Sequence, residues 1–331
     1  MRIIMASRES DWRREAENSI LLKSVSHWRE KPDRWFRGSY DRLPETVRVN
    51  PMSEEKDWVE AWLSGIGANR IPWFSGPGSA WEMPFERGSA EEEVKSLMSA
   101  LHETGRITRQ EAVSMLPVLA LDPTPGQIIL DLCASPGSKT TQICEHLGDS
   151  GAVVANEVIS GRVNTLVTNV QRHASRTVLV VQHDGRHIPR VPGSGFDGVL
   201  VDVPCTGSGT TRKNPDVWGK WRPSSGRSLH SLQYDLLTRA IELTKPGGRV
   251  VYSTCSLDPI ENEAVVARVL AGGKVRVVPR GDSLSGVPSN PGMTNWPLLN
   301  DKGELDNESK SEEYLIPTKD MAVSSQLNEC L

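Results

Sequence analysis

Two short stretches place a thiol directly after an apolar run. In "LVDVPCTGSGTTRKNPDVW" (200–218) the run ends on Asp202, and Cys205 follows in a loop rich in glycine, hydroxyl groups and cations. In "VVYSTCSLDP" (250–259) a second apolar run leads to Cys255. A free cysteine is most often a small buried apolar residue, but a thiol in a polar loop beside cations is stabilised as the thiolate. We therefore favour a nucleophilic role for Cys205 and Cys255.

From residue 127 onward, short β-branched runs alternate with helical stretches. They predict strands at 127–131, 152–156, 177–181, 197–202, 249–254 and 274–278, and helices at 138–147, 160–172, 226–244 and 260–271. Unbroken apolar strands separated by helices are typical of a parallel sheet covered on both faces. The sequence therefore predicts an α/β fold, a Rossmann-like doubly wound sheet that binds ligands beyond the carboxyl ends of its strands. Adjacent strands lie about 4.8 Å apart, so Cys205 and Cys255, which follow neighbouring strands, would face one pocket.

The ends of four successive predicted strands carry a turn or an acid. "ILDLCASPGSKTTQ" (129–142) is a strand, a turn and a helix start, but Ser138 stands where a phosphate-binding P-loop requires glycine. Glu157, Asp184 and Asp202 follow the next three strands. One such acid is ordinary, for instance at a helix N-terminus. A row of them on one sheet edge predicts an adenosine-type cofactor, with Glu157 placed for the ribose hydroxyls.

The first 95 residues differ in character, being rich in tryptophan and interrupted by proline and glycine. They predict a strand at 46–50, a helix at 53–67 and strand and turn material at 70–85, and a linking helix follows at 90–105. We expect a small α+β domain over 1–95 and the sheet domain over 96–331.

The net charge of −4 is spread unevenly. Basic residues outnumber acidic ones in 1–50 and 205–249, and the reverse holds in 280–331. Basic segments attract phosphate whatever the total charge, although solvated helix faces explain them equally well. No apolar run approaches the length of a membrane span, no signal peptide is recognisable, and the five cysteines form no Cys-x-x-Cys pair. We expect a cytoplasmic protein (or a nuclear one in a eukaryote) with free thiols, no metal and no membrane contact.

Three motifs together carry a family resemblance. "DLCASPGSKT", "DVPCTGSGTTRKNPDVWGKW" and "YSTCSLDPIENEAV" resemble the Sun family of RNA cytosine-5 methyltransferases, which use S-adenosylmethionine, and are most similar to the eukaryotic-type tRNA enzymes. The resemblance covers 105–270 continuously and 40–85 more loosely, where the family has a small RNA-binding module. It implies methyl transfer to C5 of cytosine in RNA, tRNA before rRNA. We expect a monomer.

The resemblance also implies roles for individual residues. Cys255 would be the nucleophile that adds to C6 of cytosine, Cys205 would assist product release, and Asp202 would sit between cofactor and base. The cofactor-binding set would be Cys133, Ala134, Ser135, Pro136, Gly137, Ser138, Lys139, Glu157, Asp184 and Asp202. For the flanking nucleotides we expect cationic and aromatic contacts, and the candidates are Arg212, Lys213, Trp218, Lys220 and Trp221. For the two tryptophans an anchoring role in the core is an equally good alternative.

Two departures from the family and two alternatives remain. The family's PGGKT is PGSKT here, and the chain ends at "SSQLNECL" where the family continues to a Gly-Gly-Phe-Phe-like strand, so we expect a C-terminally truncated domain. A DNA cytosine-5 methyltransferase would use the cysteine of the Pro-Cys pair and would not need Cys255. An inactive RNA-binding or assembly factor on the same fold is the second alternative.

Overall fold

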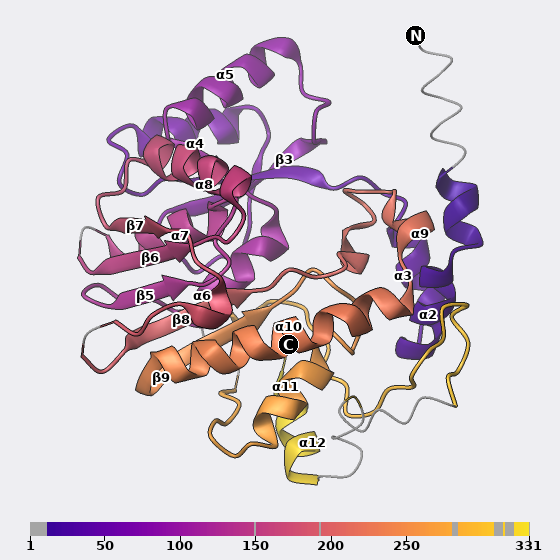
Figure 1. Cartoon of the computed structure of the whole chain (residues 1–331). Helices are drawn as coiled ribbons and strands as arrows, with labels where there is room; N and C mark the ends of the chain where they lie inside the picture. The colour runs from indigo at the N-terminus through magenta and orange to yellow at the C-terminus, as the bar shows by residue number, and fades with distance from the viewer. Residues whose placement is uncertain are drawn as a thin grey trace.

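Five parallel strands form the central sheet, in the order β7-β6-β5-β8-β9 (Figure 1). The computed structural model describes residues 12–148, 150–191, 193–279, 284–307, 314 and 321–330. The strands are β5 (Ile128–Asp131), β6 (Ala152–Asn156), β7 (Val178–Val181), β8 (Phe196–Asp202) and β9 (Thr244–Ser253). The predicted Rossmann-like sheet is confirmed for these five strands.

Helices cover both faces of this sheet because the strands are apolar on both sides. Val199 and Val201 of β8 belong to the core under α10, whereas Leu200 between them belongs to the core with α6 and α7. In Figure 1, α10 crosses the near face of the sheet beside β8 and β9. The covering helices are α6 (Leu116–Leu121), α7 (Ser138–Leu147), α8 (Ser160–His173) and α10 (Pro223–Leu243).

The sixth predicted strand, 274–278, is wrong. Val275 and Val277 instead pack on the core formed with α11 (Glu263–Leu270) and α12 (Met321–Leu327). The N–H of Val277 donates to the Gln326 side chain at 3.0 Å rather than to a strand. An alternating apolar run can be buried against helices as well as in a sheet. The pattern therefore does not distinguish a strand from an irregular segment packed on helices.

A second, antiparallel sheet has the order β2-β3-β1-β4. Its strands are β1 (Pro44–Val49), β2 (Asn69–Arg70), β3 (Ser79–Glu86) and β4 (Ile107–Arg109). Val59 of α4 (Lys56–Gly65) and Met98 of α5 (Glu92–Glu103) are buried in the core on one side of this sheet. The α+β unit therefore continues through β4, beyond the expected boundary at residue 95, because β4 pairs with β1.

The N-terminal helices α2 (Ile20–Trp28) and α3 (Pro32–Gly38) pack beside α9 (Val217–Lys220) rather than on the antiparallel sheet (Figure 1). Their contact is aromatic, with Trp28 edge-on to Trp221 at 5.7 Å between ring centroids and Phe36 edge-on to Trp218 at 5.6 Å. Residues far apart in the sequence thus share one core. Within the described part of the chain, no helix has the length and apolarity that crossing a membrane requires.

Candidate active site

The site is built at the carboxyl edge of the parallel sheet. The register aligns Asp131 of β5 with Ala155 of β6, and Asp202 of β8 with Ser253 of β9. The loops that follow these strands therefore meet at one edge. The polar strand ends expected from the sequence converge there.

The turn over 133–139 joins β5 to α7. Gly137 has a φ of +110°, a backbone conformation that favours glycine, and a Cβ at this position would lie close to Leu166 Cδ1, at 3.0 Å. Arg162 of α8 holds the turn in place, because its Nη2 donates to the Ser135 carbonyl at 2.7 Å and the Ser135 hydroxyl donates back to the Arg162 carbonyl at 3.0 Å. Ser138, the departure from the family motif, is the first residue of α7.

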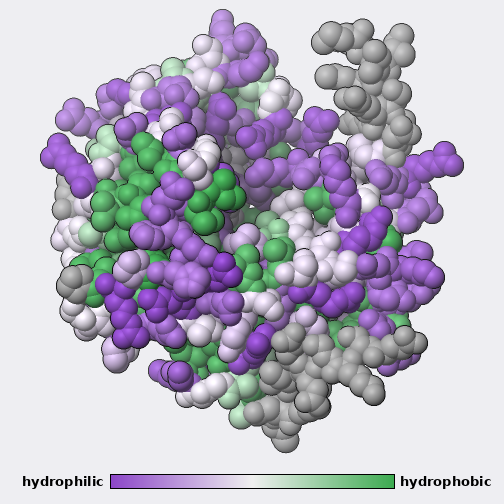
Figure 2. All heavy atoms as spheres, in the orientation of Figure 1, coloured by the Kyte–Doolittle hydropathy of each residue, from purple (hydrophilic) through white to green (hydrophobic). Residues whose placement is uncertain are grey.

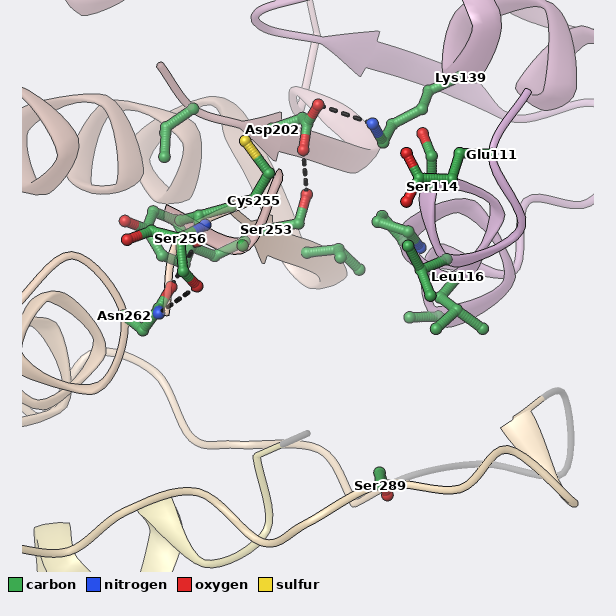
Figure 3. Close-up of a pocket in the computed structure, with 18 of the residues that line it drawn as sticks. Glu111, Ser114, Leu116, Lys139, Asp202, Ser253, Cys255, Ser256, Asn262 and Ser289 are labelled. Carbon is green, nitrogen blue, oxygen red and sulfur yellow. Dashed lines mark hydrogen bonds and ion pairs between the residues drawn. The ribbon is translucent and has the colours of Figure 1, made fainter. Parts of the chain in front are cut away.

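Asp202 connects the turn over 133–139 to the end of β9, because it binds both Lys139 and Ser253. Lys139 Nζ lies 2.7 Å from Asp202 Oδ2, and the Ser253 hydroxyl donates to Oδ1 at 2.7 Å. Figure 3 shows the carboxylate between Lys139 and Ser253, with the Cys255 sulfur pointing to the same side. The ion pair is only partly exposed, at 15% and 32% for the two side chains. It therefore fixes the carboxylate at the mouth of the site.

The two thiols are in direct contact. Cys205 Sγ lies 3.0 Å from Cys255 Sγ, and the Cys255 N–H donates to Cys205 Sγ at 3.3 Å. The hydrogen bond from Cys205 lowers the pKa of Cys255, with help from the Lys139 ammonium and against burial and the Asp202 carboxylate, which raise it. The same contact, together with burial, raises the pKa of Cys205 well above that of an ordinary thiol. The contact thus favours the thiolate at Cys255 and the neutral thiol at Cys205.

Asp131 is a residue that the sequence analysis missed. It is 1% exposed, and the Thr140 hydroxyl donates to its Oδ2 at 2.7 Å, while its Oδ1 has no hydrogen-bond partner among the described residues. Burial raises the pKa of Asp131 to about 7. In the sequence, Asp131 is simply the last residue of a strand. Its burial beside the turn over 133–139 makes it a candidate for the cofactor site.

Glu157 and Asp184 lie at the ends of β6 and β7. Glu157 is 3% exposed, accepts from the Ile159 N–H at 2.9 Å and lies 3.6 Å from Arg162 Nη1. Asp184 is paired with Arg186 at 2.6 Å, and hydrogen bonds from Arg186 lower the pKa of Asp184 to about 2. Both acids keep the strand-end positions expected for cofactor contacts.

The five residues proposed to contact RNA lie in different environments. Trp218 and Trp221 are 0% and 3% exposed, so stacking on nucleotides is wrong for both, and they anchor the aromatic core instead. Arg212 donates to the backbone carbonyls of Asp41 and Arg42, which ties its loop to the chain before β1. The remaining two are exposed, Lys220 paired with Asp216 at 2.7 Å and Lys213 at the rim of the site.

A cleft of about 3400 Å³ opens around Cys255, Asp202 and Lys139. In Figure 2, a hollow is visible near the centre of the surface that faces the viewer. Exposed cations line the cleft on the side of the N-terminal elements and of the loop after β8, among them Lys31, Arg34, Arg87 and Lys213, and the acid Glu30 lines it too. The cleft is large and partly cationic, as a polyanionic substrate requires.

The fold and the strand-end site together define a Rossmann-like methyltransferase domain. The family model described as "16S rRNA methyltransferase RsmB/F" matches residues 118–297. The chain belongs to this family.

Known relatives agree with this assignment. The chain is 42% identical over 248 residues to the multisite-specific tRNA:(cytosine-C(5))-methyltransferase of Saccharomyces cerevisiae, covering 69% of this chain and 36% of that protein. It is 45% identical over 213 residues to the tRNA (cytosine(34)-C(5))-methyltransferase of Drosophila melanogaster, covering 59% and 29%. The chain spans about a third of the length of these curated relatives. The solved structure of a methyltransferase homolog protein from Pyrococcus horikoshii superposes with a TM-score of 0.66 at 30% identity, covering 89% of this chain and 86% of that one.

Proposed function

We propose that this chain transfers a methyl group from S-adenosylmethionine to C5 of cytosine in RNA. The observation that carries the proposal is the contact of Cys205 and Cys255 beside Asp202, with the pKa of Cys255 lowered and that of Cys205 raised. Two thiols whose pKa values are shifted in opposite directions suit a reaction that needs first a nucleophile and then a base.

The residues at the sheet edge fit the cofactor. The unpartnered Oδ1 of buried Asp131 suits the ammonium of a methionine moiety, and Gly137 leaves its backbone open to close approach. Glu157 and Asp184 would hold the ribose and the adenine region, and the turn 133–139 the methionine part. When bound, S-adenosylmethionine supplies an electrophilic methyl group.

Cys255 starts the reaction on the base. Its thiolate adds to C6 of cytosine, and the electrons of the C5–C6 double bond move toward C5 and N3, so that C5 becomes nucleophilic. The Asp202 carboxylate, held by Lys139 and Ser253, is placed to accept a hydrogen bond from N3–H once solvent has protonated that nitrogen. The base must leave any stack for the thiolate to reach C6.

Cys205 acts in the second half. Once the Cys255 sulfur is bonded to carbon it carries no charge, so the contact that raised the pKa of Cys205 is gone. Cys205 can then lose its own proton to solvent and, as a thiolate, accept the C5 proton, so that the C5–C6 double bond re-forms and Cys255 leaves as the thiolate. Each sulfur thereby returns to its starting state, and the net proton released is the one that Cys205 gave to solvent.

For the substrate we favour tRNA over rRNA. The two relatives described above are named as tRNA enzymes, whereas the matching family is described by 16S rRNA. We place the reaction in the cytoplasm, where the free cysteines stay reduced. The RNA backbone would cross the cations of the cleft, so affinity should fall steeply as salt rises. The inactive-factor alternative is not favoured, because Lys139, Asp202 and both thiols meet in one site.

The test is methyl transfer with tritiated cofactor to tRNA and to 16S rRNA transcripts, followed by bisulfite mapping of the labelled RNA. We expect label at a cytosine of tRNA, and none with the Cys255→Ala variant. Labelling of rRNA alone would replace the substrate but keep the chemistry. Cofactor and RNA binding without any labelling would point to the assembly factor instead.

A further inference from the structure

A buried carboxylate joins the two loops that carry the thiols. Glu261 is 0% exposed and lies just before α11. It accepts hydrogen bonds from the Thr206 N–H at 2.9 Å and from the hydroxyls of Thr206 and Ser256. Thr206 directly follows Cys205, and Ser256 directly follows Cys255. One side chain thus binds the neighbour of each thiol.

The rest of the surroundings of Glu261 is also fixed. Gln233 of α10, itself 0% exposed, donates to Glu261 Oε1 and to the Pro204 carbonyl, both at 3.0 Å. The Trp221 indole donates to the Thr206 hydroxyl at 3.0 Å. We call the bonds from Thr206 and Ser256 to Glu261 the clasp. Through Trp221, the aromatic core under the N-terminal helices also supports this clasp.

We propose that Glu261 is a positioning residue that sets the contact between Cys205 and Cys255. Buried carboxylates are tolerated where hydrogen bonds satisfy them, and here the donors belong to the two loops whose spacing decides the chemistry. Besides the clasp, the hydroxyls of Thr206 and Ser256 are in contact at 3.3 Å. Further along the same loops, the Ser208 and Ser256 hydroxyls lie 3.0 Å apart and the Gly209 N–H donates to the Cys255 carbonyl at 2.9 Å, but these bonds do not involve the residue that directly follows Cys205. The role in methyl transfer rests on the proposed function, whereas the effect on the thiols does not.

The charge of Glu261 and the thiol contact that it positions shift the pKa of Cys255 in opposite directions, which makes the proposal testable. The negative charge of Glu261 by itself raises the pKa of Cys255, whereas the hydrogen bond from Cys205 lowers it. Glu261→Gln removes the charge but keeps a side chain of the same shape that can bond the same groups. Glu261→Ala removes both the charge and the clasp. A purely electrostatic role would lower the pKa in both variants, whereas a clasp raises it in Glu261→Ala alone.

The experiment is alkylation of Cys255 by iodoacetamide across pH, followed by peptide mass spectrometry, which needs neither RNA nor cofactor. In Glu261→Ala we expect the midpoint of the pH profile to move up, with the rate at pH 7 falling about threefold for each unit of pKa, since the rise in intrinsic nucleophilicity offsets part of the lost thiolate. Glu261→Gln should keep the midpoint or lower it slightly. Glu263→Ala is the matched control, because its carboxylate accepts from the Met293 N–H instead.

Folding is checked by circular dichroism and thermal unfolding. If Glu261→Ala does not fold, Thr206→Val decides, because it removes one hydroxyl of the clasp, and Thr206→Ser should restore the wild-type profile. An unchanged midpoint in the clasp-breaking variant, or an equal downward shift in Glu261→Ala and Glu261→Gln, would overturn the proposal. If the variants alter the alkylation of Cys255 but the wild type transfers no methyl group, the proposed function is wrong and the positioning role of Glu261 stands.

Discussion

Cys205 and Cys255 touch through their sulfur atoms at 3.0 Å, although fifty positions separate them in the chain. Two neighbouring parallel strands, β8 and β9, bring them together, since Asp202 and Ser253 are paired in register. The contact shifts their pKa values in opposite directions, which favours the thiolate at Cys255 and the neutral thiol at Cys205.

The first prediction concerns the order in which the thiols act. Cys255→Ala should abolish methylation and form no covalent RNA adduct, because no other thiolate faces C6. Cys205→Ala should still form the adduct but resolve it slowly, so a protein–RNA species that survives denaturing gels should accumulate. The double variant should trap nothing. A trapped adduct in Cys255→Ala would reverse the roles and favour the DNA-type arrangement, and wild-type turnover in both single variants would make the thiols structural.

The second prediction concerns pH. The folded-state pKa of Cys255 is lowered, so the midpoint of its pH profile should lie below the pKa of an ordinary thiol, about 8.5. Cys205→Ala removes the donor and should move the midpoint of Cys255 alkylation upward. Cys330→Ser, at a thiol outside the pair, should leave the midpoint where it is. An identical midpoint in Cys205→Ala would mean that the S–H donor does not tune Cys255.

Much of the fold could be predicted because the five sheet strands are apolar on both faces and end in turns. The strand predicted at 274–278 failed because its burial comes from helices rather than from a neighbouring strand. Trp218 and Trp221 could not be assigned from local sequence, since what buries them is a pair of helices some 180 positions earlier. Long-range packing of this kind leaves no periodic trace.

The site shows the same limit. Cys205 and Cys255 were found because thiols in polar loops after strands are unusual, Asp202 because it belongs to a row of strand-end acids, and Lys139 because it belongs to the turn over 133–139. The structure brings the four together. Asp131 and Glu261 were missed because a strand-end acid and a turn acid are common in sequence. Their distinguishing property is full burial, which depends on the tertiary fold. The catalytic roles themselves remain predictions until the variants are measured.

The third prediction concerns Asp131. Burial raises its folded-state pKa to about 7 from 3.8, so the folded state binds more protons than the unfolded state between these values. The free energy of unfolding should therefore fall as pH rises from 4 to 7, by on the order of a few kcal/mol. Asp131→Asn should flatten this slope and raise the melting temperature at pH 8. It should not abolish the slope, because burial also raises the pKa of Asp258, to about 8.

Asp131→Asn should also weaken cofactor binding, since it removes the charge proposed to face the methionine ammonium. Thermal unfolding between pH 5 and pH 8 measures the first effect, and titration calorimetry with S-adenosylmethionine measures the second. A variant that is stabilised at pH 8 yet binds the cofactor with wild-type affinity would take Asp131 out of the cofactor site. An unaltered pH slope would show that the carboxyl is not the group that titrates.

The last prediction concerns the joint between the two sheets. Arg48 of β1 is 0% exposed, and its guanidinium bonds both oxygens of Glu145 on α7, at 2.9 Å from Nε and 2.8 Å from Nη2. Its Nη1 also donates to the Ser138 carbonyl at 3.1 Å, which belongs to the turn proposed for the cofactor. His173 lies 3.2 Å from Glu145 Oε1. Burial raises the pKa of Glu145, but Arg48 and His173 outweigh it and hold the pKa below its usual value.

Arg48→Met should leave Glu145 charged and buried, which costs about 3–5 kcal/mol in the free energy of unfolding. Replacing both partners, as Arg48→Met with Glu145→Leu, should recover much of that loss because no unpaired charge remains. Lys95→Ala, which breaks an exposed pair with Glu92, should change little. Urea unfolding of the four proteins measures these differences. Since Arg48 also holds the Ser138 carbonyl, the double variant should regain stability without regaining cofactor affinity, and recovery of both would show that the antiparallel sheet has no part in shaping the turn.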